Sequence, residues 1–198
     1  MGVPVLNTSR LSAAKVEIAR LIEREFAAAG FSPYAAAAAV VNAYAESGFN
    51  PAAVGDKGAS VGLFQLHERG AGAGMTVEQR KDPVANTRRI IETARRSGPF
   101  MALAATSTSV PDLAASFSTH VERPFDKAGA ERKRREYATM LYSLSEAAPL
   151  PIPSLSVVPT SLANAGRSTD WWLPATGVAL AFLVLAVVIR KRREQASA

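Results

Sequence analysis

The feature that most constrains the fold is an almost wholly apolar stretch from Tyr34 to Tyr44. Ser32 and Pro33 precede it, a capping residue followed by the residue preferred in the first turn of a helix. Gly48 follows it and suits the left-handed position that closes a helix. The pattern predicts a helix that ends near Glu46. Because a helix that is apolar on all sides needs neighbours around it, this helix is expected at the centre of the domain.

The rest of the N-terminal three quarters of the chain shows mainly helical periodicity. Residues 49–75 are rich in Gly, Asn and Pro and are expected to form a loop with at most a short hairpin. Thr76 and Gln79 form a predicted capping box. Further helices are expected at residues 11–29 closed by Gly30, at 82–98 with Gly98 as its stop, at 111–121 and at 126–145. The expected fold class is all-α, with at most a small hairpin.

Composition narrows the kinds of site that the chain can carry. It has no cysteine, so a disulfide framework and a thiolate metal site are excluded. His67 and His120 are its only histidines and no zinc-binding spacing surrounds them, so we expect neither a metal nor a cofactor. The net charge is +6, with basic groups at 88–96 and 132–135 that we expect to be solvated helix faces. No nucleic-acid-binding signature accompanies them, so we expect no nucleic-acid partner.

The last quarter of the chain has a different character. Residues 147–170 are rich in Pro and Ser and predict a semi-extended linker after a domain at residues 1–146. An apolar run of 19 residues then extends from Trp171 to Ile189. As a helix it would be about 28 Å long, close to the ~30 Å of a bilayer core. Two tryptophans at its start and Arg190 to Arg193 at its end suit the two membrane interfaces. Residues 171–198 therefore predict a single membrane span with a basic tail.

Glu46 is the residue whose position favours chemistry. It follows the most apolar helix of the domain, where loss of water raises the pKa of a carboxyl group. It also lies at the negative end of that helix, which disfavours a carboxylate in the same way. A carboxyl group that keeps its proton near neutral pH can act as a general acid.

The residues around Glu46 resemble a known superfamily. Glu46-Ser47 is followed by Asn50-Pro51 and then by Gly62-Leu63-Phe64-Gln65. This order resembles the lytic transglycosylase and lysozyme superfamily, in which a Glu-Ser pair ends a helix and a Gly-Leu-x-Gln turn follows. Residues 55–58 and Glu122-Arg123-Pro124 look most like the phage tail lysozyme branch. The resemblance covers roughly residues 11–145 and implies a lysozyme-like fold and cleavage of MurNAc–GlcNAc linkages in peptidoglycan glycan strands.

The resemblance also implies roles for single residues. Glu46 would be the catalytic acid and then the base. Ser47 would contact the sugar near its acetamido group or steady the glutamate, and Gln65 would line the cleft and contact substrate. Phe64 is expected to be simple core. The Ala-Tyr-Asn motif of the transglycosylases has no counterpart here, and Tyr137 is only a candidate for a neighbouring position in the cleft.

That departure leaves the product open. A transglycosylase needs one glutamate and forms a 1,6-anhydro sugar, whereas a hydrolytic muramidase usually needs a second carboxylate. Asp56 is the best candidate in the sequence, although an Asp beside glycine is also typical of a turn. Glu122 is a second candidate, and a structural salt bridge is its alternative role. Both residues therefore stay candidate substrate-contacting residues.

The architecture suggests where the protein works. A catalytic domain without a recognisable signal peptide and with a C-terminal span suits a phage virion enzyme that opens the wall locally during infection. It would sit in an internal virion membrane or in the host membrane, and other virion proteins are expected as partners. Residues 173–177, Leu-Pro-Ala-Thr-Gly, match a sortase signal and give the alternative of a wall-anchored bacterial muramidase. A non-catalytic, membrane-anchored protein for glycan binding or virion assembly is the second alternative.

Overall fold

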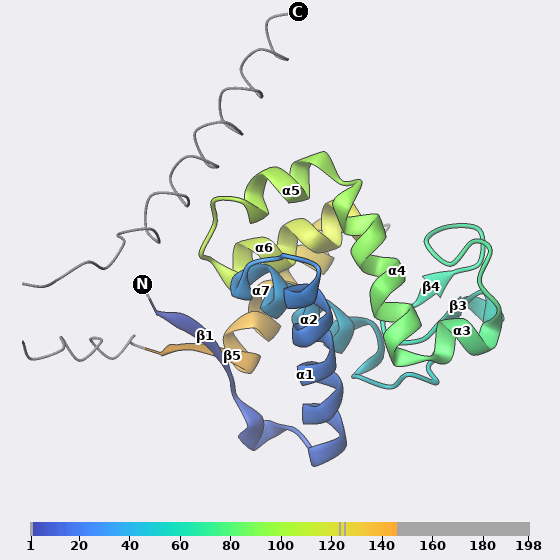
Figure 1. The fold of residues 1–198 in the computed structure, drawn as a ribbon, viewed down its shortest axis with the longest axis horizontal. Helices are drawn as coiled ribbons and strands as arrows, with labels where there is room; N and C mark the ends of the chain where they lie inside the picture. The colour runs from blue at the N-terminus through green and yellow to red at the C-terminus, as the bar shows by residue number, and fades with distance from the viewer. Residues whose placement is uncertain (1, 123, 125, 146–198) are drawn as a thin grey trace, which may run out of the picture. The chain divides into compact units, whose positions relative to one another are not determined.

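The predicted central helix is present and is enclosed by other helices (Figure 1). The structure is a computed structural model and describes residues 2–122, 124 and 126–145. Helix α2 (Pro33–Ser47) begins where Ser32 Oγ accepts a hydrogen bond from the backbone N–H of Ala35. It ends at Gly48, whose φ is 60°. Every residue from Ala35 to Ala43 is buried, so the apolar stretch forms the core as predicted.

The other helices cover α2 and extend from it. The helices that pack directly on α2 are α1 (Ala13–Ala28), α6 (Val110–Phe117) and α7 (Lys127–Leu141). Three further helices connect β4 to α6 along the chain: α3 (Val77–Lys81), α4 (Pro83–Arg95) and α5 (Gly98–Ala104). The capping box at Thr76 and Gln79 is confirmed at the start of α3, and the side chain of Asp82 caps α4. The polypeptide continues from α6 into a π-helical turn, η3 (Ser118–Glu122).

The segment at 49–75 holds more regular structure than a loop. Strands β2 (Val54–Gly55), β3 (Ser60–Val61) and β4 (Leu66–His67) form an antiparallel sheet, with the short 3-10 turn η2 (Asp56–Gly58) between the first two. Figure 1 shows this sheet next to α3, on the side of the molecule away from β1 and β5. The small hairpin that was expected is therefore a three-stranded sheet, and the fold is α+β of the lysozyme kind.

A second sheet joins the two ends of the domain and corrects the prediction of a helix over 126–145. Helix α7 ends at Leu141, and β5 (Tyr142–Ser145) pairs antiparallel with β1 (Val3–Leu6). Leu6 lies opposite Tyr142, and both side chains are buried. The two strands lie more than 130 residues apart in the sequence, at the two ends of the domain. Their pairing overrides the helical preference of residues 142–145. A 3-10 turn, η1 (Thr8–Arg10), connects β1 to α1.

The predicted stop at Gly98 is wrong. Helix α4 ends at Arg95, and Gly98 is the first residue of α5. Pro99 explains the difference, because proline fits the first turn of a helix, where its missing N–H leaves no hydrogen bond unmade. The short apolar segment after Gly98 is thus a helix, and it places Phe100 in the core.

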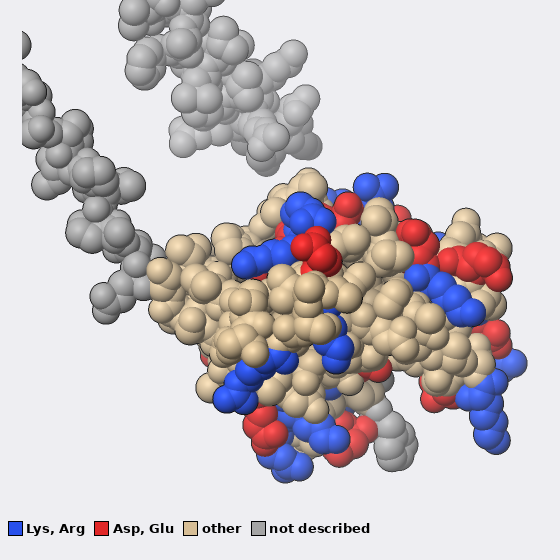
Figure 2. Space-filling view, turned by 90° about the horizontal axis from the view of Figure 1, so that it is seen from below, with Lys and Arg blue, Asp and Glu red and all other residues tan. Residues whose placement is uncertain are grey.

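The charged side chains of the surface are mixed in sign on the face that Figure 2 shows, with blue and red groups close together at the rim of an uncharged area. Arg88 of the first basic group follows the prediction of a solvated helix face, since 67% of its side chain is exposed while it pairs with Glu25. The second group contains an exception, Arg134, which is 5% exposed. Arg80, outside both groups, is also buried, at 3% exposed, so two arginines depart from the solvated surface expected of charged side chains.

The predictions for the C-terminal part of the chain stay predictions. The linker at 147–170 and the span at 171–189 lie outside the described residues. In the part of the chain that the structure describes, no helix combines the length and the apolar character needed to cross a bilayer.

Candidate active site

A cleft of about 640 Å³ lies between the small sheet and the helical part of the domain. Glu46 lines it from the end of α2. One set of lining residues belongs to the sheet segment: Asp56, Ser60, Phe64, Gln65, Leu66, His67, Gly70 and Ala71. The other set belongs to the helices: Ile90, Thr93, Arg96, Ser97, His120, Val121, Glu122 and Pro124. The structure therefore brings the predicted residues Glu46, Asp56, Gln65 and Glu122 to one cleft.

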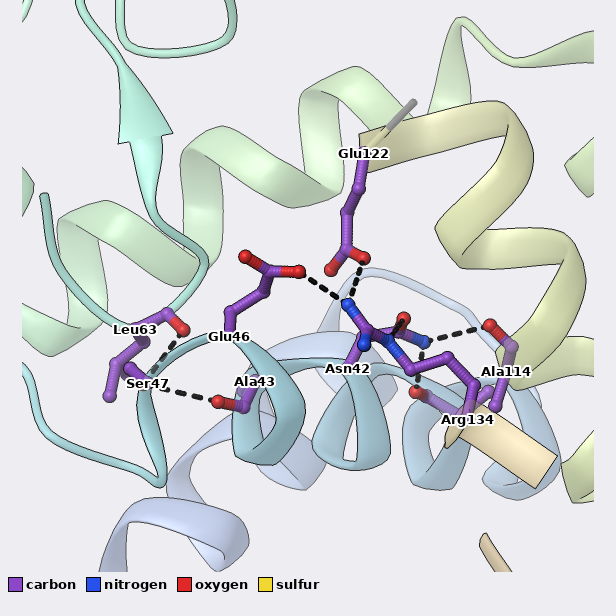
Figure 3. A network of polar contacts seen from close by, with 9 residues as sticks. Asn42, Ala43, Glu46, Ser47, Leu63, Ala114, Glu122 and Arg134 are labelled. Atoms are coloured by element: carbon purple, nitrogen blue, oxygen red, sulfur yellow. Dashed lines mark hydrogen bonds and ion pairs between the residues drawn. The ribbon is translucent and has the colours of Figure 1, made fainter. Parts of the chain in front are cut away.

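Glu46 is partly sheltered and has a charged partner. Its side chain is 26% exposed, and Oε1 accepts a hydrogen bond from a terminal N–H of Arg134. Figure 3 shows its other carboxyl oxygen on the side away from Arg134. One oxygen of Glu46 is thus held by the protein, and the other is left for the cleft.

Arg134 is the residue of this site that the sequence did not reveal. It lies on α7 on the same face as the buried Ala138 and Leu141, so its side chain points into the domain. Its Nε donates to Asn42 Oδ1 at 2.8 Å, and its terminal nitrogen donates to Glu122 Oε2 at 3.1 Å as well as to Glu46 (Figure 3).

Asn42 lies one helical turn before Glu46 and is fully buried. Its amide group donates to the carbonyl oxygens of Ala38 at 2.8 Å and Ala114 at 3.1 Å, which leaves Oδ1 free to accept from Arg134. A buried guanidinium needs such partners, because an unpaired buried charge is costly. Asn42, the one amide within the apolar stretch from Tyr34 to Tyr44, is a signal in the sequence that could have indicated a buried polar partner.

Burial controls the proton affinity of both glutamates. Loss of water raises the pKa of Glu46, the charge and hydrogen bond of Arg134 oppose this, and the charge of Asp56 raises the pKa further. Burial also raises the pKa of Glu122 to about 8, with the charge of Glu46 acting in the same direction and Arg134 and Ser118 acting against it. The raised pKa that the sequence predicts for Glu46 is therefore reproduced, and burial is the dominant cause.

Ser47 and Gln65 fix the turn at residues 62–65, two residues of which line the cleft. The hydroxyl of Ser47 lies 2.9 Å from the carbonyl oxygen of Leu63 and 3.1 Å from that of Ala43, and the residue is not among those that line the cleft. Gln65 does line the cleft, and its amide donates to the carbonyl oxygens of Gly62 at 3.0 Å and Ala53 at 3.2 Å. In this arrangement Ser47 ties the turn to the end of α2, and its contact with sugar stays a prediction.

Asn86 holds the same turn from α4 and is a second residue that sequence reasoning missed. Its Oδ1 accepts from the backbone N–H of Phe64 at 3.1 Å, and its amide donates to the carbonyl of Arg80 at 2.6 Å. Gly62 has a φ of 89°, and a side chain there would collide with Asn86 and with the Arg80 backbone. Phe64 is 3% exposed and packs with its ring centre 6.2 Å from that of Phe117, so it is core, as expected, as well as part of the cleft wall.

The remaining candidates differ in their surroundings. Asp56 accepts a hydrogen bond from the hydroxyl of Ser60, and both residues line the cleft. Glu122 comes from η3, and its side chain is only 8% exposed. Tyr137 packs edge-on against Tyr44 with ring centres 5.1 Å apart and is not a lining residue of the cleft. Within residues 2–122, 124 and 126–145, no three His, Asp or Glu side chains gather closely enough to hold a metal ion.

Comparison with protein families decides the relationship. The model of the phage tail lysozyme family matches residues 17–144, which is more than half of the chain and includes every residue of the cleft. The chain belongs to the phage tail lysozyme family. This confirms the resemblance seen in the sequence and indicates a peptidoglycan-degrading, lysozyme-like glycosidase function. Comparison with curated proteins gives no match.

The phage tail lysozyme fold accounts for the way in which the functional side chains are distributed. The general-acid candidate comes from α2, the candidate second carboxylate comes from η2 between two strands of the small sheet, and the buried Arg134 comes from α7. Only the first two belong to the segment whose motif the sequence displays. Arg134 and Asn42 contribute through contacts between residues 92 positions apart in the chain.

Proposed function

We propose that the protein is a muramidase that hydrolyses the MurNAc–GlcNAc linkage of peptidoglycan, with Glu46 as its general acid. The observation that carries the proposal is the position of Glu46, half-sheltered at the end of a buried helix and facing a cleft of about 640 Å³. Burial raises its pKa, which favours the protonated form that an acid needs. The cleft is large enough for sugar rings, since ligand sites are commonly about 300–1,000 Å³.

In this mechanism the oxygen of Glu46 that faces the cleft gives its proton to the leaving glycosidic oxygen as the C–O bond breaks. Asp56, on the sheet side of the same cleft, takes a proton from a water whose oxygen bonds to the sugar carbon. The hydroxyl of Ser60 holds the Asp56 side chain in place. Proton exchange with solvent then restores both carboxyl groups, and the sum of the reaction is the addition of one water.

Asp56 is also the reason for preferring hydrolysis to transglycosylation. A transglycosylase needs no second carboxylate, because the muramic acid's own hydroxyl group completes the reaction. Here the charge of Asp56 acts on Glu46, so the two carboxyl groups are close enough to influence each other. Tyr137, the candidate for a transglycosylase tyrosine, packs on Tyr44 and not along the cleft.

For the biological setting we propose a virion enzyme that opens the bacterial wall locally during infection. The family match supports a phage origin over the alternative of a wall-anchored bacterial muramidase. A single membrane anchor at residues 171–189, in an internal virion membrane or the host membrane, is part of this proposal and rests on the sequence pattern alone.

The test uses the full chain in mild detergent and purified peptidoglycan. The wild type is expected to release muropeptides, and Glu46→Gln is expected to release none because the amide has no acidic proton to give. Glu17→Gln is the matched control, since Glu17 is exposed on α1. Equal release by wild type and Glu46→Gln would remove the enzyme proposal and leave the glycan-binding alternative.

Mass spectrometry of the same products separates the two reactions. Hydrolysis leaves a reducing muramic acid end, whereas transglycosylation leaves a 1,6-anhydro end that is one water lighter. Asp56→Asn is expected to lower the rate of hydrolysis. Anhydro products from the wild type would contradict the role given to Asp56 and keep that of Glu46.

A further inference from the structure

The proposed reaction leaves Glu122 without a task, although it is the most buried acid of the cleft. Its side chain is 8% exposed, and it comes from the π-helical turn η3. Oε2 accepts from Arg134 at 3.1 Å, while Oε1 is buried and makes no hydrogen bond of standard geometry within the described residues, although the Ser118 hydroxyl lies near enough to lower the pKa of this carboxyl group. Buried polar atoms normally have a partner, so this one needs an explanation.

The charges of the cluster give that explanation. Arg134 pairs with both Glu46 and Glu122, so one positive charge serves two carboxyl groups (Figure 3). Two carboxylates beside one guanidinium would leave a net negative charge in a poorly solvated place, which is costly. One carboxyl group therefore keeps its proton, as in other pairs of close carboxyl groups that titrate jointly. The cluster is neutral when it holds one proton and one carboxylate.

The hydrogen bonds show which oxygens can carry that proton. Oε1 of Glu46 and Oε2 of Glu122 both accept from Arg134, so each is unprotonated. The proton is left to Oε1 of Glu122 or to Oε2 of Glu46. The first is the buried oxygen that makes no hydrogen bond of standard geometry, and the second is the oxygen on the side away from Arg134, in a residue that lines the cleft. A proton on Glu46 is thus in the right place for donation to substrate.

We propose that Glu122 is a positioning residue that, through Arg134, makes Glu46 hold its catalytic proton more tightly. This rests on the proposed function of Glu46 as the general acid. If Arg134 paired with Glu46 alone, the ion pair would favour the carboxylate, which is the wrong form for an acid. Glu122 shares Arg134 and one proton with Glu46, and in those molecules in which Glu122 is the ionised partner its negative charge favours the proton on Glu46. The acid form of Glu46 then persists at a pH where an isolated Glu46–Arg134 pair would have lost it.

Other charged groups around the pair stay the same when Glu122 is changed. The negative charge of Asp56, from η2, raises the pKa of Glu46. Among the described residues, the other titratable and charged groups nearby are His120 of η3, His67 of β4, Arg96 after α4, and Glu131 of α7, which accepts from Thr119. Arg134 pairs with both carboxyl groups, so Glu122→Gln changes the sharing of Arg134 between them.

The experiment is the pH profile of kcat/KM for the full chain, with wild type, Glu122→Gln and a control. Glu122→Gln keeps the size of the side chain and cannot ionise. The kcat/KM of Glu122→Gln is expected to begin to fall, as the pH rises, about one pH unit lower than that of the wild type. After both profiles are normalised at their optimum, this gives the variant a roughly tenfold lower activity near pH 8. Asp112→Asn is the matched control, because Asp112 pairs with Arg135, the next residue of α7, at the surface. Its profile is expected to coincide with that of the wild type.

Two outcomes overturn the proposal: identical normalised profiles for Glu122→Gln and wild type, or a uniform loss of activity at every pH, which indicates a merely structural role. A second measurement does not need activity. Carboxyl ¹³C NMR of the wild type is expected to show Glu46 and Glu122 titrating jointly, each with two steps. Independent single-step curves would reject the shared proton. This titration tests Glu122 even if Glu46→Gln proves active, so failure of the proposed function and failure of this inference are distinguishable.

Discussion

Replacing Glu122 by Gln is expected to change how the stability of the protein depends on pH. Burial raises the pKa of Glu122 to about 8 in the folded state, whereas a carboxyl group in an unfolded chain has a pKa of about 4.3. Between these values the folded protein binds the proton and the unfolded protein does not. The free energy of unfolding of the wild type therefore falls as the pH rises through this window, and its contribution is lost above pH 8. Gln is neutral in both states and removes this term.

The size of the effect follows from the number of protons involved. One full proton difference changes the free energy of unfolding by about 1.4 kcal/mol per pH unit. From pH 5.5 to 7.5 the upper limit is thus about 2.7 kcal/mol. Because Glu46 shares the proton and its own pKa is raised as well, part of the dependence stays in the variant. Between pH 5.5 and 7.5 we expect the free energy of unfolding of Glu122→Gln to rise by about 1–2 kcal/mol relative to that of the wild type. This corresponds to several degrees in Tm for a domain of this size.

The assay is urea unfolding followed by far-UV circular dichroism at pH 5.5 and 7.5. At each pH we take the difference in free energy of unfolding between variant and wild type. The change in this difference from pH 5.5 to pH 7.5 is the quantity of interest, because any constant cost of the substitution cancels in it. Glu17→Gln provides the control, since its exposed carboxyl group should give the same difference at both values. If the difference for Glu122→Gln is equally constant, Glu122 does not take up a proton on folding, and the account of its burial is wrong.

Two further predictions concern the frame of the cleft. Phe117 is fully buried between Phe26, Phe64 and Phe100. In urea unfolding, Phe117→Ala is expected to lower the free energy of unfolding by about 3–5 kcal/mol. The control is Leu144→Ala, at an exposed residue, which is expected to change it by no more than about 0.5 kcal/mol. Gly62→Ala would place a methyl group 2.1 Å from the Arg80 carbonyl oxygen and is expected to reduce both stability and muropeptide release. Gly74 has a similar φ of 79° but open space around it. Gly74→Ala is expected to lower the free energy of unfolding by only about 1 kcal/mol and to leave muropeptide release unchanged. Equal effects of Gly62→Ala and Gly74→Ala would contradict the role given to the close packing at Gly62.

The parts of the fold that the sequence predicted well are those with local signals. Ser32-Pro33 and Gly48 mark the ends of α2, and the apolar stretch from Tyr34 to Tyr44 between them predicts burial, which the structure has from Ala35 to Ala43. The capping box of α3 is of the same kind. Glu46 could be found because its position at the end of this helix is itself a local property. The spacing of the Glu-Ser and Gly-Leu-x-Gln motifs likewise reflects one contact, between the Ser47 hydroxyl and the Leu63 carbonyl, within 16 residues.

What the sequence did not predict depends on distant contacts. Strand β5 looks like the end of a charged helix until β1 is beside it. Arg134 looks like one more cation in the run from Arg132 to Arg135, and only the packing of α7 on α2 distinguishes it from its neighbours. The partners of Arg134 on α2 lie 88 and 92 residues away in the chain. No periodicity within one helix carries that information.

Asn42 connects the fold to the chemistry of the site. It and Glu46 are four residues apart, so α2 presents both on one face toward α7, and Arg134 binds both. The apolar character of α2 has two opposing consequences there. It excludes water, which favours a protonated Glu46, and it makes any nearby cation dependent on bonds from the protein, which favours an ionised Glu46. Asn42 and Glu122 reduce the second effect, since each takes one of the hydrogen bonds of Arg134 that an isolated pair would direct at Glu46. A helix buried for the sake of the core can therefore also hold an acid, provided that its cation is shared.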